Sequence, residues 1–182
     1  MGLDNTIRIR PASLSDLSGI LRVIHAAFPN EESAVIAPMV AQLFADQNTP
    51  PVLSWVAESD QQIVGYVGFS PVHFESAEAG SAYILAPLAV LPVCQKQGIG
   101  SRLVEAGISG LKERAVDAWM VYGDPDYYGR FDVTDTVGAY FVPPYPLEYP
   151  FGWQAVMLTD RPKPSKPIQF SCVEALSSPE LW

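Results

Sequence analysis

Gln95, Lys96, Gly98 and Gly100 stand where an apolar run gives way to a predicted helix, in the stretch LAVLPVCQKQGIGSRLVEAG at residues 88–107. Glycine lets the backbone approach a ligand closely and adopt unusual dihedral angles. The first amides of a helix have no intrahelical acceptor and carry partial positive charge. Gln95 can add an amide donor and Lys96 a full positive charge. The pattern therefore predicts either a site for a phosphate-like anion or a helix start that only needs a tight turn.

Two common phosphate-binding motifs do not fit this stretch. A P-loop needs Gly-x-x-x-x-Gly-Lys followed by Ser or Thr, and that pattern is absent from the sequence. A dinucleotide-binding fingerprint needs a third glycine where Leu103 stands, and it normally follows the first strand of a βαβ unit. Nearly half of the chain precedes this turn, so the dinucleotide interpretation is disfavoured.

The stretch resembles the acetyl-CoA-binding motif of the GNAT superfamily of N-acetyltransferases. That motif is a Leu- or Val-rich strand, then Gln or Arg, two residues, Gly, one residue, Gly or Ala, and then a helix. Gln95, Gly98 and Gly100 match its three fixed positions. The resemblance implies acetyl-CoA as cosubstrate, with its pyrophosphate on the turn and its pantetheine arm paired with the strand. The cofactor-binding residues implied are Leu88, Ala89, Val90, Gln95, Lys96, Gln97, Gly98, Ile99, Gly100 and Ser101.

A second stretch, VYGDPDYYGRFDV, resembles the Gly-Asp-Pro-x-Tyr-Tyr-x-Arg-Phe-Gly-Phe segment of a bacterial GNAT subgroup, the YhbS-type acetyltransferases. Residues 123–131 match it position for position, and Asp132 and Val133 then replace Gly-Phe. The resemblance implies that Tyr128 is the general acid that protonates the departing thiolate. The alternatives are a Tyr128 packed in the core with its hydroxyl satisfied, and Tyr127 as the acid in its place.

A general base is harder to assign. The strand AYILAPLAV carries no carboxylate, whereas many members of the family have a glutamate there. By position only, the candidates are His73, Glu75, Glu31 and Glu32, although each fits a solvated surface residue better. A chain of water molecules to bulk solvent would serve the same purpose.

Cys94 lies beside the turn and raises the question of a covalent mechanism. Such a mechanism needs an activating histidine, and no local pattern supplies one. Direct transfer of the acetyl group is therefore preferred. The resemblance further implies that a backbone N–H near Leu88–Val90 polarises the acetyl carbonyl.

The elements that must position these residues follow from hydrophobic periodicity. TIRIRPA alternates as a strand does, and Ser13 with Asp16 predicts a capping box for the first helix. Two apolar stripes predict two helices, and Pro38 marks either the start of the second helix or a kink in it. Two strands follow, SWVAES and QIVGYVGFSPVHF, joined as a hairpin by a polar turn at residues 60–62.

A nearly apolar strand, SAYILAPLAVLP, is typical of a buried central position. Pro87 has no N–H to donate, so it predicts a bulge or a break in pairing. A helix over residues 98–115 comes next, then the strand AWMVYGD, the short helix PDYYGRFD, the strand GWQAVMLTD and a final strand at IQFSCVEAL. The order β-α-α-β-β-β-α-β-α-β predicts an α+β fold around one sheet.

Composition excludes several classes of function. The net charge of −9 argues against a nucleic-acid partner, and the longest apolar run is too short and too proline-rich to span a membrane. Two distant cysteines, Cys94 and Cys172, form neither a disulfide framework nor a metal-ligand pattern. We therefore expect a cytoplasmic protein without a metal.

These observations together predict a single GNAT domain over residues 1–182, with its sheet splayed between the fourth and fifth strands. The expected activity is direct transfer of the acetyl group from acetyl-CoA to a primary amine of a small molecule or peptide. The alternative is a non-catalytic sensor that keeps the fold and the acyl-CoA site. The segment AYFVPPYPLEYPFGW, residues 139–153, is expected to shape acceptor choice or to serve as a packed loop or a dimer contact. Homodimers are common among such proteins, and the sequence leaves that state open.

Overall fold

The computed structural model describes residues 6–182, which fall into two compact units. Unit 1 contains the residues up to Gln47 together with Val52–Phe69 and Pro87–Gly110. Unit 2 contains Asn48–Pro51, Ser70–Ala86 and Leu111–Trp182. Two long strands, β3 (Gln62–Phe74) and β4 (Ala82–Val90), each contribute one part to each unit.

The strands of unit 1 follow the order β1-β2-β3-β4. β1 (Arg8–Pro11) and β2 (Leu53–Ser59) are antiparallel, and β2 forms a hairpin with β3. The predicted polar turn is present, and Asp60 and Gln61 both have positive φ, at 49° and 63°. Two consecutive left-handed residues suit the right-handed twist of a hairpin.

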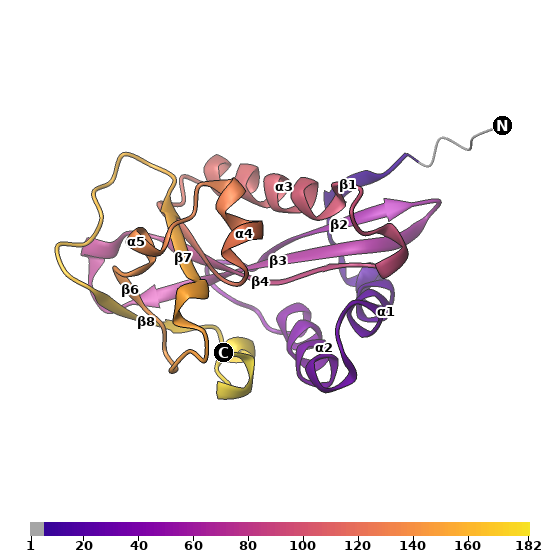
Figure 1. The fold of residues 1–182 in the computed structure, drawn as a ribbon, viewed down its shortest axis with the longest axis horizontal. Helices are drawn as coiled ribbons and strands as arrows, with labels where there is room; N and C mark the ends of the chain where they lie inside the picture. The colour runs from indigo at the N-terminus through magenta and orange to yellow at the C-terminus, as the bar shows by residue number, and fades with distance from the viewer. Residues whose placement is uncertain (1–5) are drawn as a thin grey trace. The chain divides into compact units, whose positions relative to one another are not determined.

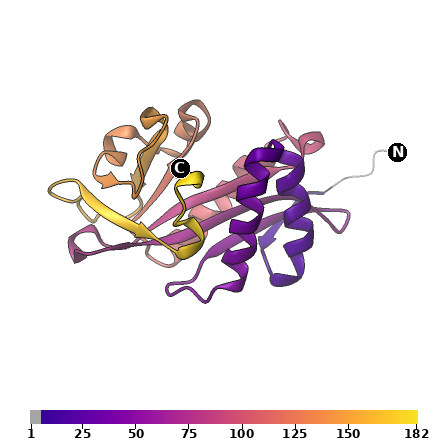
Figure 2. The ribbon, with the colours of Figure 1, turned by 90° about the horizontal axis from the view of Figure 1, so that it is seen from below.

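Helices cover both faces of these strands. α1 (Leu17–Ala27) and α2 (Asn30–Ala45) lie on one face, and α3 (Ile99–Glu113) lies on the other (Figures 1 and 2). The apolar stripe of α1 is buried as predicted, with Ile20, Val23 and Ile24 fully enclosed. A side chain at Gly107 or Gly110 would collide with the rings of Phe69 and Trp55, so the absence of side chains lets α3 lie close to the sheet.

The position of Pro38 inside the second helix excludes one of its two predicted roles. α2 begins at Asn30 and passes through Pro38, so Pro38 does not start it. Proline cannot donate the usual hydrogen bond there, but a long apolar face packed against α1 and the sheet maintains the helix. Glu31 and Glu32 therefore lie in the first turn of α2 rather than between the helices.

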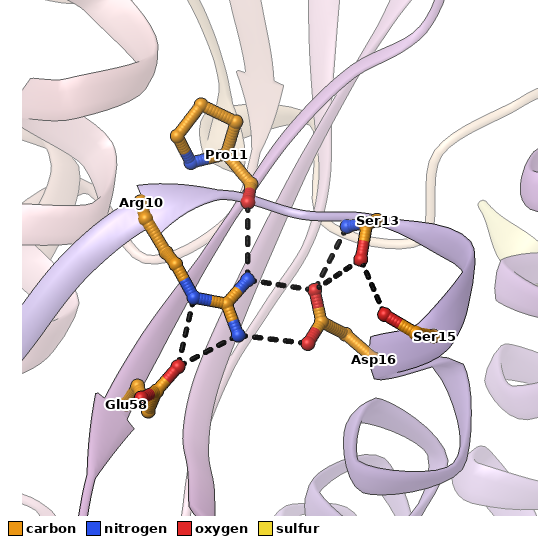
Figure 3. A network of polar contacts seen from close by, with 6 residues as sticks. All are labelled: Arg10, Pro11, Ser13, Ser15, Asp16 and Glu58. Carbon is orange, nitrogen blue, oxygen red and sulfur yellow. Dashed lines mark hydrogen bonds and ion pairs between the residues drawn. The ribbon is translucent and has the colours of Figure 1, made fainter. Parts of the chain in front are cut away.

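A charged network joins β1, β2 and the start of α1 (Figure 3). The guanidinium group of Arg10 donates to both carboxylate oxygens of Asp16 at 2.8 Å, and its Nε donates to Glu58 at 2.8 Å. The Asp16 carboxylate also accepts the Ser13 backbone N–H at 2.8 Å, which is the acidic half of the predicted capping box. The Arg10 side chain thus links β1 both to the nearby start of α1 and to the distant strand β2.

Unit 2 is built around β5 (Ala118–Tyr122), which is parallel to β4 and antiparallel to β7 (Trp153–Met157). The end of β3 pairs with β8 (Ile168–Cys172), and β8 also pairs with the short β6 (Phe141–Val142). Two short helices, α4 (Pro125–Tyr128) and α5 (Asp135–Gly138), follow β5 (Figure 1). The mixed, mostly antiparallel sheet with flanking helices confirms the α+β prediction.

The parallel pairing of β4 with β5 stops at Leu85, two residues before Pro87, whereas β4 itself runs on to Val90. This is the break that Pro87 predicted. Within residues 6–182, no helix combines the length and the apolar character that a membrane span requires.

Candidate active site

The glycine turn of unit 1 adopts two left-handed residues in quick succession. After β4 comes one 3₁₀ turn over Pro92–Cys94, and the backbone then reaches Lys96 at φ 61° and Gly98 at φ 79°. Glycine adopts that φ without strain, whereas a lysine in the same region is uncommon. The shape of the turn therefore comes from these two backbone dihedral angles. The left-handed conformation of Lys96 could not be predicted from the sequence.

The first backbone N–H groups of α3 have no acceptor inside the helix. Arg102 N–H donates to the Gly98 carbonyl oxygen at 3.1 Å, so the helical ladder begins at Gly98. The amides of Ile99 and Gly100 precede that bond and have no acceptor inside the helix. A β-carbon built on Gly98 would meet no atom within 4 Å, which shows open space directly in front of the turn. Open space and amides without helical acceptors together fit a phosphate-like group.

Two glutamines bind the turn to the chain before it. Gln95 Nε2 donates to the Val90 carbonyl oxygen at 3.0 Å, and Gln97 Nε2 donates to the Val93 carbonyl oxygen at 3.3 Å. One amide hydrogen of each side chain is therefore used to hold the turn. Lys96 is exposed, and its ammonium group is available to solvent or to an anion.

Leu88–Val90 form the last part of β4 and lead into this turn. Ala89 and Val90 are buried, and the Leu91 N–H donates to the Val64 carbonyl oxygen at 2.9 Å, which fixes the strand end on β3. Because the register with β5 ends at Leu85, the backbone of Leu88–Val90 has no β5 partner. An extended ligand with amide groups could pair with such an edge.

Tyr128 closes the short helix α4 of unit 2. Asp124 caps the helix: its carboxylate accepts the Asp126 N–H at 2.9 Å, and its carbonyl accepts the Tyr128 N–H at 2.9 Å. The Tyr128 ring is partly buried and meets Tyr127 edge to face, with 4.9 Å between the ring centroids. Burial raises the pKa of Tyr128 above its ordinary value of 10, and the neighbouring Tyr127 raises that pKa further.

Tyr127 has structural partners of its own. The Arg130 guanidinium carbon lies 4.5 Å from the centroid of the Tyr127 ring, and Arg130 Nε donates to the Tyr127 carbonyl oxygen at 2.8 Å. The cation–π contact and the hydrogen bond both hold Tyr127 in place. This environment suits a supporting residue.

Comparison with known proteins identifies the family. The profile of the acetyltransferase (GNAT) family matches residues 20–127. The chain is also 34% identical over 152 residues to the uncharacterized N-acetyltransferase YjhQ of Escherichia coli K12, with 81% of this chain and 82% of YjhQ covered. The chain belongs to the GNAT family of acetyltransferases.

Two solved GNAT structures share the fold over almost the whole chain. The structure of YhbS from Escherichia coli in complex with CoA has a TM-score of 0.83 and 26% identity, covering 98% of this chain and 96% of YhbS. A GNAT acetyltransferase from Brucella melitensis in complex with acetyl-CoA has a TM-score of 0.67 and 26% identity, covering 94% and 99%. The family resemblance and the GNAT fold predicted from the sequence are confirmed, and the chain is an acetyl-CoA-dependent N-acetyltransferase.

The base candidates of this GNAT chain are all exposed. Glu31 and Glu32 lie in the first turn of α2, His73 lies on β3, and Glu75 directly follows that strand. Within the described residues none of these four is enclosed in a way that would tune it for proton transfer. This environment is compatible with proton loss to water.

The segment of residues 139–153 has side chains in two kinds of environment. Phe141 and Trp153 are buried, and Trp153 Nε1 donates to the Phe141 carbonyl oxygen at 2.8 Å. Between them, Tyr149 and Phe151 are 53% and 67% exposed, with 5.9 Å between their ring centroids. Phe141 and Trp153 are therefore structural, whereas the residues just before Trp153 present an aromatic pair to solvent.

Proposed function

We propose that this GNAT chain transfers the acetyl group of acetyl-CoA directly to a primary amine, with residues 1–182 acting as one catalytic domain. The observation that carries the proposal is the turn before α3. Gly98 is left-handed, with open space where its β-carbon would be, and the amides of Ile99 and Gly100 have no acceptor inside the helix. Backbone donors of this kind suit a pyrophosphate, which the relatives' solved complexes with CoA and acetyl-CoA support.

The residues of the turn and strand have separate roles in this proposal. The amides after Gly98 hold the pyrophosphate, Lys96 adds charge, and Leu88–Val90 pair with the pantetheine arm. Gln95, Gln97 and Ser101 complete the cofactor-binding set, with both glutamines keeping the turn in shape through their bonds to Val90 and Val93.

Acetyl transfer needs a neutral amine, a polarised carbonyl and a proton for the departing sulfur. Acetyl-CoA supplies the activated thioester. A backbone N–H within Leu88–Val90 polarises its carbonyl, and the Tyr128 hydroxyl gives a proton to the sulfur. A tyrosine is protonated at neutral pH in any case, and because burial raises the pKa of Tyr128, its phenol keeps that proton at alkaline pH as well. The acceptor amine loses its proton to water, since the carboxylate and histidine candidates are exposed.

The acceptor is a small molecule or a peptide that presents a primary amine. The exposed rings of Tyr149 and Phe151 contact its apolar part in this proposal. The cytoplasm is the proposed location, since Cys94 and Cys172 are both free thiols and a reducing compartment keeps them so.

The decisive experiment is calorimetric titration of acetyl-CoA into the wild type and a Gly98→Asp, Gly100→Asp double variant. We expect micromolar binding by the wild type, about −8 kcal/mol, and at least a ~100-fold loss in the variant, because its carboxylates repel the pyrophosphate and an aspartate at the left-handed position 98 strains the turn. A Ser109→Asp, Lys112→Gln control lowers the net charge equally at the far end of α3 and should bind normally. A folded wild type that binds no acetyl-CoA would overturn the proposal.

A further inference from the structure

The ring of Tyr128 lies against the backbone of Gly123 in unit 2. A β-carbon added to Gly123 would lie 2.5 Å from Cε2 and 2.9 Å from Cδ2 of Tyr128. Both distances are shorter than the approach that real β-carbons make, so any side chain at position 123 must displace the ring. The helix α4 that carries Tyr128 begins only two residues after Gly123, so the connecting backbone is short.

Hydrogen bonds from β7 and from the residue directly before it fix the backbone of Gly123. Its N–H donates to the Gly152 carbonyl oxygen at 2.9 Å. Its carbonyl oxygen accepts Gln154 Nε2 at 3.3 Å, and the same amide reaches the Gly152 carbonyl oxygen at 3.3 Å. Gln154 is only 3% exposed, so its amide has been taken out of water to make these bonds. The Gly123 backbone is therefore fixed, and the Tyr128 ring is the part that would move.

The neighbouring aromatic residues limit where the ring could go. Tyr127 meets it edge to face at 4.9 Å between centroids, and Phe131 lies 6.5 Å away. Tyr127 is in turn held by the Arg130 guanidinium. With these rings around it and Gly123 against one side, the phenol has one well-defined place.

We propose that Gly123 is a positioning residue for Tyr128: the absence of a β-carbon at position 123 determines where the Tyr128 hydroxyl presents its proton. Gln154 supports that role by holding the Gly123 carbonyl. The inference rests on the proposed acid role of Tyr128 and adds to it the residue on which the placement of the hydroxyl depends.

The test compares Gly123→Ala with Gly129→Ala. Gly129 lies in the same segment, has an ordinary helical φ of −56°, and a β-carbon there would meet nothing within 4 Å. We expect Gly123→Ala to lower kcat at least about tenfold with the KM for acetyl-CoA within twofold, because a small misplacement of a reacting group is costly. Gly129→Ala should match the wild type. In a Tyr128→Phe background Gly123→Ala should have no further effect on kcat, since the hydroxyl on which it acts is gone.

A second readout needs no turnover. In protein with ¹³C-labelled tyrosine rings, Tyr128→Phe assigns the Tyr128 signal, and titration then follows its pKa. Gly123→Ala should lower that pKa towards its ordinary value as the ring moves into solvent, with Tyr127, Asp124 and Arg130 unchanged around it. Gln154→Met, which keeps the bulk of residue 154 but removes the donor, should lower the pKa less, and it provides the test if Gly123→Ala fails to fold.

A Gly123→Ala variant with wild-type kcat and an unchanged Tyr128 titration would overturn the positioning role. If Gly123→Ala fails to fold, a Gln154→Met variant with the wild-type Tyr128 titration would do the same. Full turnover in Tyr128→Phe would instead remove the acid role, and the titration would still report whether Gly123 places the ring. Failure of the inference and failure of the proposed acid are therefore distinguishable.

Discussion

The turn of residues 95–101 and the cluster around Tyr128 are built in opposite ways. The turn is made of neighbours in sequence, with its shape given by backbone dihedral angles at Lys96 and Gly98. The Tyr128 cluster depends on Gly152 and Gln154, residues that follow much later in the chain. Ligand binding by backbone amides tolerates many side chains, whereas proton donation depends on one hydroxyl. The two regions should therefore respond very differently to single substitutions.

The two regions also differ in their exposure to solvent. The turn is exposed from Gln95 to Gly98, where charge interactions are screened. Tyr128 is sheltered, and burial raises the pKa of its phenol above the ordinary value. The residues proposed for acetyl-CoA binding and for proton transfer therefore lie in differently hydrated parts of the chain.

The largest effect should come from Tyr128→Phe. Removing the hydroxyl should lower kcat about 100-fold, the usual contribution of a general acid, while leaving acetyl-CoA affinity unchanged. Steady-state kinetics with a reactive amine, alongside calorimetry, measures both. Tyr127→Phe is the matched control and should stay within about twofold; a reversed ranking of the two variants would transfer the acid role to Tyr127.

The pH dependence of turnover tests the same region without a substitution. Because the pKa of Tyr128 is raised, loss of this acid should not lower kcat between pH 7 and pH 10, its ordinary pKa. A decline of kcat with a midpoint near pH 10, absent from Tyr128→Phe, would show a phenol that titrates as an exposed tyrosine does rather than a sheltered one. Rates measured with an amine of low pKa keep the acceptor from dominating the profile.

Asp16→Asn should affect stability without affecting either region. The hydrogen-bonded Arg10 lowers the pKa of Asp16 from its ordinary value of 3.8 to about 2, so the ionised group stabilises the fold above pH 4. A shift of this size corresponds to about 2 kcal/mol, measured by urea unfolding at pH 7. The difference between wild type and variant should shrink as the pH falls towards 2.

Glu113→Gln makes the same chemical change at an exposed carboxylate and should cost less than about 0.5 kcal/mol. Equal costs for Asp16→Asn and Glu113→Gln would mean that the Arg10 network does not stabilise unit 1. Acetyl-CoA affinity should be normal in both variants.

Lys96→Gln should weaken acetyl-CoA binding only about threefold, because an exposed ion pair contributes under 1 kcal/mol. The salt dependence of binding should also become shallower. Calorimetry at two ionic strengths measures both effects. Loss of all binding would show that the lysine, and not the backbone, dominates the turn. Lys112→Gln is the control for removal of a lysine charge elsewhere.

Cys94→Ser should have the smallest effect, with turnover within about twofold of the wild type, since direct transfer needs no thiol. Intact-protein mass spectrometry after mixing with acetyl-CoA should show no acetylated protein. Abolished turnover together with an acetyl adduct on the wild type would establish a covalent route through Cys94.

The sequence alone determined the features that depend on neighbouring residues. Residues 62–74 form the predicted strand β3, Pro87 lies just beyond the end of the β4–β5 pairing, and Gly98 takes the left-handed turn. Each follows from local rules of alternation, a missing donor or a missing side chain. The motifs around Gln95 and Tyr128 identified the family for the same reason.

Only the tertiary structure decided the rest. The two-residue strand β6 and the short helix α5 are too short to show a hydrophobic period and so could not be predicted. β6 forms by pairing with β8, and α5 forms by packing against β7. The contact of Gly123 with the Tyr128 ring has no sequence signature that separates it from a simple turn glycine. It depends on Gly152 and Gln154 holding one side of Gly123, which happens only when β7 has paired with β5. Backbone dihedral angles depend mainly on neighbouring residues. The position of the Tyr128 ring, in contrast, depends on distant residues that pack against it.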